Sequence, residues 1–138
     1  MIKNFEIQND LSQISVLAST VESFFSKNNI IDDIILDINL ALEELVVNII
    51  SYAFDDQHKH LIYVSLRIHE AKYIEIIIKD AGKEFNPLDI QAPDLDALLE
   101  DRGIGGCGIH LVRTLMDEVE YKREDGNNIS TIRKKINN

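Results

Sequence analysis

The segment Ala41-Leu-Glu-Glu-Leu-Val-Val-Asn48 carries the pattern that decides how this chain folds. Its apolar residues recur with the 3.6-residue period of an amphipathic helix, which the surrounding sequence extends over about residues 32–54. Glu44 and Asn48 are one turn apart and share a polar stripe beside the apolar one. This stripe is either a solvated helix face or a site where an acid accepts a proton and an amide oxygen binds Mg²⁺.

Outward from this helix, the period of the apolar residues changes several times. The predicted helices and strands, in chain order, are a strand at 5–8, a helix at 11–28, the central helix, strands at 60–69 and 73–79, a helix at 106–116, and strands at 119–123 and 129–135. Residues 81–104 hold both prolines, and we expect an irregular loop there with one helical turn at 94–100. The sequence Asp125-Gly-Asn-Asn128 predicts the turn of a closing hairpin.

This order of elements predicts an α+β fold, a two-layer sandwich with helices on one face of a mostly antiparallel sheet. We expect a single domain over residues 1–138. The chain has 24 acidic and 14 basic residues and a formal charge of −10, which argues against a nucleic-acid partner. No apolar run approaches the roughly 20 residues that span a bilayer, and the single cysteine cannot form an internal disulfide, so we expect a cytoplasmic protein without membrane contact.

The triplet Asp80-Ala-Gly82 follows an isoleucine-rich strand and is either a plain turn or part of a base-binding pocket. A carboxylate held at a strand end can accept a hydrogen bond from an exocyclic amine such as that of adenine. Gly82 has no Cβ, so a base could approach the backbone closely at this position.

The glycine cluster Gly103-Ile-Gly-Gly-Cys-Gly108 opens the last predicted helix. It is not a dinucleotide fingerprint, because it follows a loop and lies late in the chain, and no Gly-Lys-Ser/Thr follows to make a P-loop. The two remaining interpretations are a hinge and a glycine turn whose free N–H groups face an anion such as phosphate. Arg102, just before the cluster, is either a surface residue or a cation that stabilises a transferred phosphoryl group.

Taken together, these motifs resemble those of the GHKL ATPase superfamily, which shares the Bergerat ATP-binding fold. Within it, the chain is most similar to the small bacterial anti-sigma-factor serine/threonine kinases over nearly its whole length. The segment 41–48 resembles their N box, 80–87 their first glycine box, and 103–112 their second. The chain departs from the family pattern at Lys83, where proline is frequent, and at Cys107, where a larger apolar residue is common.

The resemblance implies roles for individual positions. Glu44 would be the general base, Asn48 would bind Mg²⁺ next to the nucleotide, and Asp80 and Gly82 would hold the adenine. The glycines would cradle the phosphates: Gly103, Gly105, Gly106 and Gly108. Thr131 would support the adenine through water, and Arg102 would contact the γ-phosphate.

The same resemblance implies an ATP- and Mg²⁺-dependent serine kinase that binds a sigma factor and phosphorylates an anti-anti-sigma protein of the STAS class. Residues 1–30 contain no histidine, so we expect phosphorylation of another protein rather than of the chain itself. The alternative is a non-catalytic ATP-binding switch that sequesters or activates a protein partner. A homodimer is a further expectation, because such dimers are common in the family.

Overall fold

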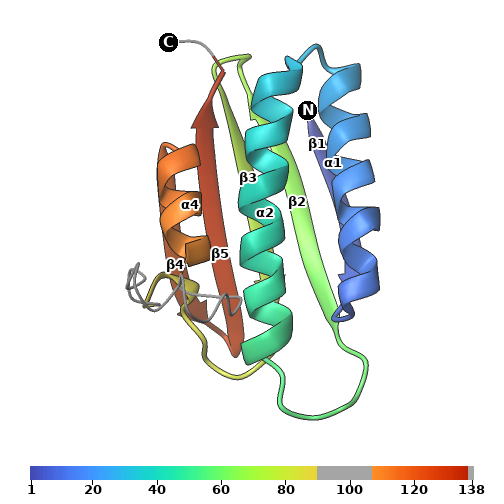
Figure 1. Ribbon diagram of the computed structural model, residues 1–138, viewed down its shortest axis with the longest axis vertical. Helices are drawn as coiled ribbons and strands as arrows, with labels where there is room; N and C mark the ends of the chain where they lie inside the picture. Colours follow the sequence, from blue (N-terminus) through green and yellow to red (C-terminus); the bar gives the residue numbers. More distant parts are fainter. Residues whose placement is uncertain (90–106, 137–138) are drawn as a thin grey trace, which may run out of the picture.

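The computed structural model describes residues 1–89 and 107–136 (Figure 1). Its strands are β1 (Ile2–Gln8), β2 (Leu61–His69), β3 (Tyr73–Asp80), β4 (Glu118–Glu124) and β5 (Asn127–Lys135). Its helices are η1 (Leu11–Gln13), α1 (Ile14–Lys27), α2 (Asp32–Tyr52), η2 (Pro87–Asp89) and α4 (Cys107–Leu115). The predicted helical turn at 94–100 lies outside the described residues.

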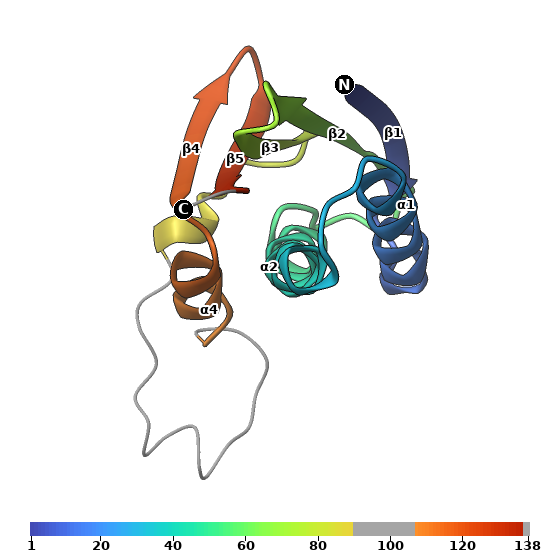
Figure 2. The same ribbon diagram turned by 90° about the horizontal axis from the view of Figure 1, so that it is seen from above.

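The five strands form one sheet in the order β1-β2-β3-β5-β4, and every neighbouring pair is antiparallel. The helices α1, α2 and α4 all cover the same face of this sheet, with α2 in the middle of the helical layer (Figure 2). This arrangement confirms the predicted two-layer α+β sandwich. Among the described residues, no helix has both the length and the apolar character needed to cross a membrane.

The core lies between α2 and the sheet, and strand alternation decides which side chains enter it. Along β3, Ile74, Ile76 and Ile78 are each at most 1% exposed and point toward the helices. Each buried side chain of this size contributes about 1.5–3 kcal/mol to folding. The same alternation turns Asp80, the last residue of β3, toward the helical layer rather than toward solvent.

The closing hairpin differs from the sequence-based prediction at its turn. Only Asp125 and Gly126 form the turn, with φ angles of 51° and 79°, and β5 begins at Asn127. Asn127 and Asn128 are therefore strand residues, and Asn128 pairs with Asp80 across the sheet. Because asparagine is common in turns, the two asparagines led to a start of the last strand that is two residues too late. Pairing with β3 places Asn128 in the strand.

Candidate functional site

The buried carboxylate of Asp80 is the centre of the candidate site. Asp80 is 1% exposed, and its Oδ1 accepts hydrogen bonds from the Gly82 N–H and from Asn128 Nδ2, both at 2.9 Å. Its Oδ2 is buried and has no hydrogen-bond partner among the described residues. Burial raises the pKa of Asp80, although the bonds from Asn128 and Gly82 favour the charged form. A free buried acceptor is costly, so it indicates a site for a donor that comes from outside the chain.

Gly82 lies tightly between the end of α2 and Asp80. A Cβ at this position would be 2.5 Å from the carbonyl oxygen of Ala53 and 2.9 Å from Asp80 Oδ1. The N–H of Lys83 donates to the same Ala53 oxygen at 2.8 Å. Glycine is therefore required here for the close approach of two backbone segments, which holds Asp80 beneath the C-terminal end of α2.

Glu44 on α2 lies against the first turn of α4. It is half-buried, and a Cβ at Gly108 would overlap its carboxylate. Burial raises the pKa of Glu44, and the neighbouring charge of Glu43 raises it further. A carboxylate with a raised pKa is a better proton acceptor at neutral pH than an exposed one, as long as it stays ionised. Asn48 follows one turn later on the same helix and is 2% exposed.

The structure brings some of the predicted site residues together and leaves others apart. Glu44 meets Gly108, and Asp80 meets Gly82, both on the side of the sheet that carries the helices. The remaining predicted residues of the glycine cluster, and the arginine before it, lie outside the described residues: Arg102, Gly103, Gly105 and Gly106.

Thr131 does not join this group, which corrects the expectation that it supports the adenine. It pairs with Ile77 and faces away from α1, α2 and α4, where it lines a hollow with Glu75 and Arg133. Its neighbour Ser130 is the inward-facing, buried residue. The pairing register with β3 sets this alternation: Ser130 lies opposite the buried Ile78 and faces the core, and Thr131 lies opposite Ile77 and faces away.

Sequence reasoning missed three residues that contact the site. Asn128 donates to Asp80, Tyr121 donates from its hydroxyl to Asn128 Oδ1 at 2.6 Å, and Arg123 donates to the Gly82 carbonyl at 2.7 Å. These residues come from the closing hairpin, where the turn signal concealed Asn128, while Tyr121 and Arg123 fall in the strand predicted at 119–123 without any sign of a role in the site. The signal that could have found Asn128 is the strand register, because antiparallel pairing of β3 with β5 places residue 128 opposite Asp80.

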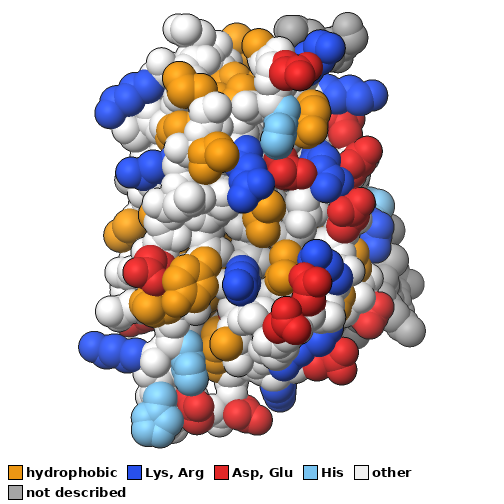
Figure 3. Space-filling model, turned by 180° about the vertical axis from the view of Figure 1, so that it is seen from behind, with side chains coloured by type: hydrophobic (Ala, Val, Ile, Leu, Met, Phe, Trp, Pro, Cys, Tyr) orange, Lys and Arg blue, Asp and Glu red, His pale blue; other side chains and the backbone are white. Residues whose placement is uncertain are grey.

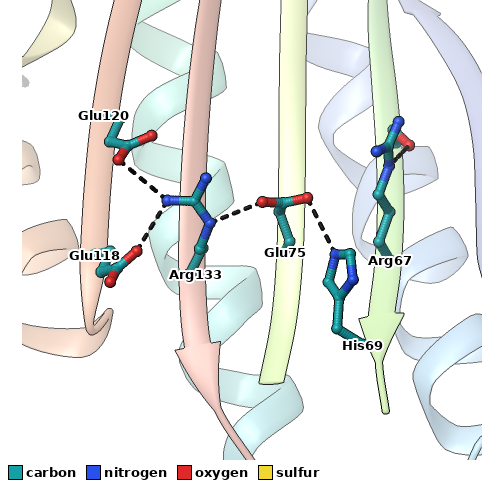
Figure 4. Close-up of polar contacts among 7 residues, drawn as sticks. Arg67, His69, Glu75, Glu118, Glu120 and Arg133 are labelled. Atoms are coloured by element: carbon teal, nitrogen blue, oxygen red, sulfur yellow. Dashed lines mark hydrogen bonds and ion pairs between the residues drawn. The ribbon is translucent and has the colours of Figure 1, made fainter. Parts of the chain in front are cut away.

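The opposite face of the sheet carries a mixture of basic, acidic and apolar side chains (Figure 3). On it, Arg133 contacts Glu75 at 2.7 Å, Glu118 at 2.9 Å and Glu120 at 3.2 Å, and His69 contacts Glu75 at 3.1 Å (Figure 4). A hollow of about 620 Å³ lies beside Glu75 and Arg133. These contacts link β3, β5 and β4 and stabilise the sheet, which accounts for the charged residues beside this hollow without a catalytic role.

The residues on the helical side fit a purine nucleotide. Asp80 Oδ2 can accept a hydrogen bond from an exocyclic amine, and Gly82 allows the close backbone packing that holds this carboxylate in place. No group of three His, Cys, Asp or Glu side chains that could hold a metal occurs in residues 1–89 and 107–136. The oxygen of Asn48 is nonetheless the kind of hard ligand that Mg²⁺ takes when phosphates supply other ligands.

Comparison with known proteins agrees with this geometry. A family model described as a histidine kinase-like ATPase domain matches residues 7–134. The serine/threonine-protein kinase BtrW of Bordetella bronchiseptica is 33% identical over 95 residues, which cover 69% of this chain and 66% of BtrW. The serine-protein kinase RsbW of Halalkalibacterium halodurans is 30% identical over 122 residues, covering 82% of this chain and 70% of that protein.

Two solved structures share the fold. The RsbU and RsbW domains of Rv1364c from Mycobacterium tuberculosis superpose with a TM-score of 0.70 at 12% identity, covering 97% of this chain and 31% of that longer chain. The SiaB–SiaC complex from Pseudomonas aeruginosa gives a TM-score of 0.59 at 17% identity, covering 99% of this chain and 89% of the other. With the family match and the identities to RsbW and BtrW, the chain belongs to the histidine kinase-like ATPase domain family, in its group of small bacterial serine-protein kinases.

Proposed function

We propose that this chain is an ATP-dependent protein serine/threonine kinase that acts as an anti-sigma regulatory factor and phosphorylates an anti-anti-sigma protein of the STAS class. The observation that carries the proposal is the buried Asp80 carboxylate, which presents one oxygen without a partner among the described residues. An adenine amine would satisfy this oxygen. The names of the relatives BtrW and RsbW, both serine-protein kinases, support the reaction type.

In the proposed reaction, the hydroxyl oxygen of a serine on the partner protein bonds to the γ-phosphorus of ATP, and the bond from that phosphorus to the β–γ bridging oxygen breaks. Glu44 accepts the hydroxyl proton, for which its raised pKa suits it. Asp80 and Gly82 orient the base, and Gly108 leaves room for Glu44 at the start of α4. When bound through Asn48 and the phosphates, Mg²⁺ supplies positive charge that offsets the charge of the triphosphate.

Titration calorimetry and a transfer assay test this proposal separately. We expect ATP to bind in a Mg²⁺-dependent manner and Asp80→Asn to abolish that binding, because the variant loses a charged acceptor for the amine. We expect Glu44→Gln to keep ATP binding and to lose phosphoryl transfer to a STAS substrate. Transfer at the wild-type rate in Glu44→Gln would refute the role of Glu44.

The alternative is a non-catalytic ATP-binding switch. It predicts the same binding results but no transfer by the wild-type protein to any STAS partner that binds it. No ATP binding by the folded protein would contradict the kinase and the switch alike.

The charge and exposed apolar residues of the chain bear on its partners and location. The charge of −10 supports protein partners, a sigma factor among them, over nucleic acid, and we propose a cytoplasmic location. We also propose a homodimer, supported by the exposed apolar residues Leu11 and Val16 at the start of the first helical segment. Sedimentation with and without ATP measures the oligomeric state.

A further inference from the structure

Asn128 lies directly opposite Asp80 in the sheet and uses its whole amide group in hydrogen bonds. It is 2% exposed. Its Nδ2 donates to Asp80 Oδ1 at 2.9 Å and to the carbonyl oxygen of Lys83 at 2.8 Å. Its Oδ1 accepts from the Phe85 N–H at 3.1 Å, the Tyr121 hydroxyl at 2.6 Å and Arg123 Nη1 at 3.1 Å.

These contacts fix which way the amide points. Three donors converge on Asn128 Oδ1, and two acceptors take both hydrogens of Nδ2. A flipped amide would oppose like groups at four of these five contacts, the exception being the Tyr121 hydroxyl, which can accept as well as donate. The donor end of Asn128 therefore always faces Asp80. With the Gly82 N–H, it occupies Asp80 Oδ1 and leaves Oδ2 as the oxygen available to a ligand.

We propose that Asn128 is the positioning residue for base recognition: it sets which oxygen of Asp80 faces the purine amine and ties that carboxylate to the backbone of Lys83 and Phe85. This inference rests on the proposed function, because it concerns the adenine site. Asn128 acts through Asp80 and does not itself need to touch the base, since its oxygen and both amide hydrogens already have partners.

The substitution Asn128→Asp keeps the shape of the side chain and replaces the donor that faces Asp80 with an acceptor. Three ionisable groups contact position 128: Asp80 on β3, and Tyr121 and Arg123 on β4. Glu84, in the segment after β3, lies near Tyr121. At neutral pH two carboxylates would face each other and Asp80 would shift or take up a proton. At lower pH a proton shared between Asp80 and the new carboxylate can replace the lost amide hydrogen.

The experiment compares the affinity of the protein for ATP and for ITP, which lacks the exocyclic amine, by calorimetry at about pH 7.5 and about pH 5.5. We expect the wild type to prefer ATP. We expect Asn128→Asp to lose about tenfold or more of its ATP affinity at the higher pH, with ITP affinity changed little. Part of that loss should return at the lower pH.

The matched control is Asn127→Asp, the same change one residue earlier, at a side chain whose amide donates to the Asp125 carbonyl oxygen. It should match the wild type at both pH values. Tyr121→Phe removes one of the donors that fix the Asn128 amide. It should lower the ATP-to-ITP affinity ratio by a smaller factor than Asn128→Asp does, and it tests the inference if Asn128→Asp does not fold.

If the wild type prefers ATP and a folded Asn128→Asp keeps the same preference, this inference is overturned and the proposed function stands. The same holds if Asn128→Asp does not fold and Tyr121→Phe keeps the wild-type ratio. If the wild type binds neither nucleotide, the inference and the proposed function are both overturned.

Discussion

At the scale of single residues, burial of the Asp80 carboxylate destabilises the folded protein and also supplies the free oxygen of the candidate site. Because its pKa is raised in the folded chain, its contribution to stability is present at low pH and is lost as pH rises through the folded pKa. We therefore expect the stability of the wild type, relative to Asp80→Asn, to fall as the pH rises above the ordinary aspartate pKa of about 4. Thermal melts of the nucleotide-free proteins measure it, with the exposed Asp89→Asn as control. An increase in this relative stability with rising pH would contradict the claim that burial raises the pKa of Asp80.

The contact between Gly108 and Glu44 gives a second prediction at this scale. Gly108→Ala would place a methyl group on the Glu44 carboxylate, and we expect it to cost about 1–3 kcal/mol of unfolding free energy through overpacking. In a Glu44→Ala background most of this cost should disappear, because the atoms that clash are absent. Urea unfolding of the four proteins in this cycle measures the coupling. Equal costs in both backgrounds would show that Glu44 does not contact Gly108.

At the scale of secondary-structure elements, the hairpin between β2 and β3 has an unfavourable turn. Glu70 and Ala71 have φ angles of 53° and 55°, in the left-handed region that residues with a Cβ rarely adopt. Asn-Gly is the pair that short hairpin turns of this kind prefer. We expect Glu70→Asn with Ala71→Gly to stabilise the protein by about 1 kcal/mol. Chemical denaturation measures the gain, and ATP affinity should not change, since Asp80 lies at the other end of β3.

The elements also show what sequence reasoning could predict. Periodicity predicted the described long helices and every strand, because burial of one face controls both patterns. The pairing of Glu44 with Gly108 did not follow from local motifs, because it depends on how α2 packs against α4. The role of Asn128 depends on the strand boundary, and an error of two residues at the turn concealed it, whereas the side on which Thr131 lies depends on the register between β3 and β5. Assigning Thr131 to the adenine, by resemblance to the family, placed it on the wrong face.

At the scale of the whole molecule, the candidate site joins the helical layer to the sheet. Gly82 contacts the end of α2, Asp80 belongs to β3, and Asn128 belongs to β5. A ligand that binds these elements only when they are assembled stabilises the native state by mass action. We expect ATP with Mg²⁺ at about 100 times its dissociation constant to add about 2.7 kcal/mol to the unfolding free energy. Calorimetric melting measures this, and no shift at saturation would contradict the site.

The position of β1 at one edge of the sheet has a consequence for how the chain assembles during synthesis. Among the described strands β1 pairs with β2 alone, and Ile2 lies opposite Arg67, so β1 is synthesised well before the strand it pairs with. The β2–β3 and β4–β5 hairpins close over short turns within about microseconds. Until β2 is made, β1 therefore has no strand to pair with, and Ile7, which is buried in the folded protein, lacks its partners in the sheet. We expect a chaperone that shields short apolar segments to bind β1 during this interval.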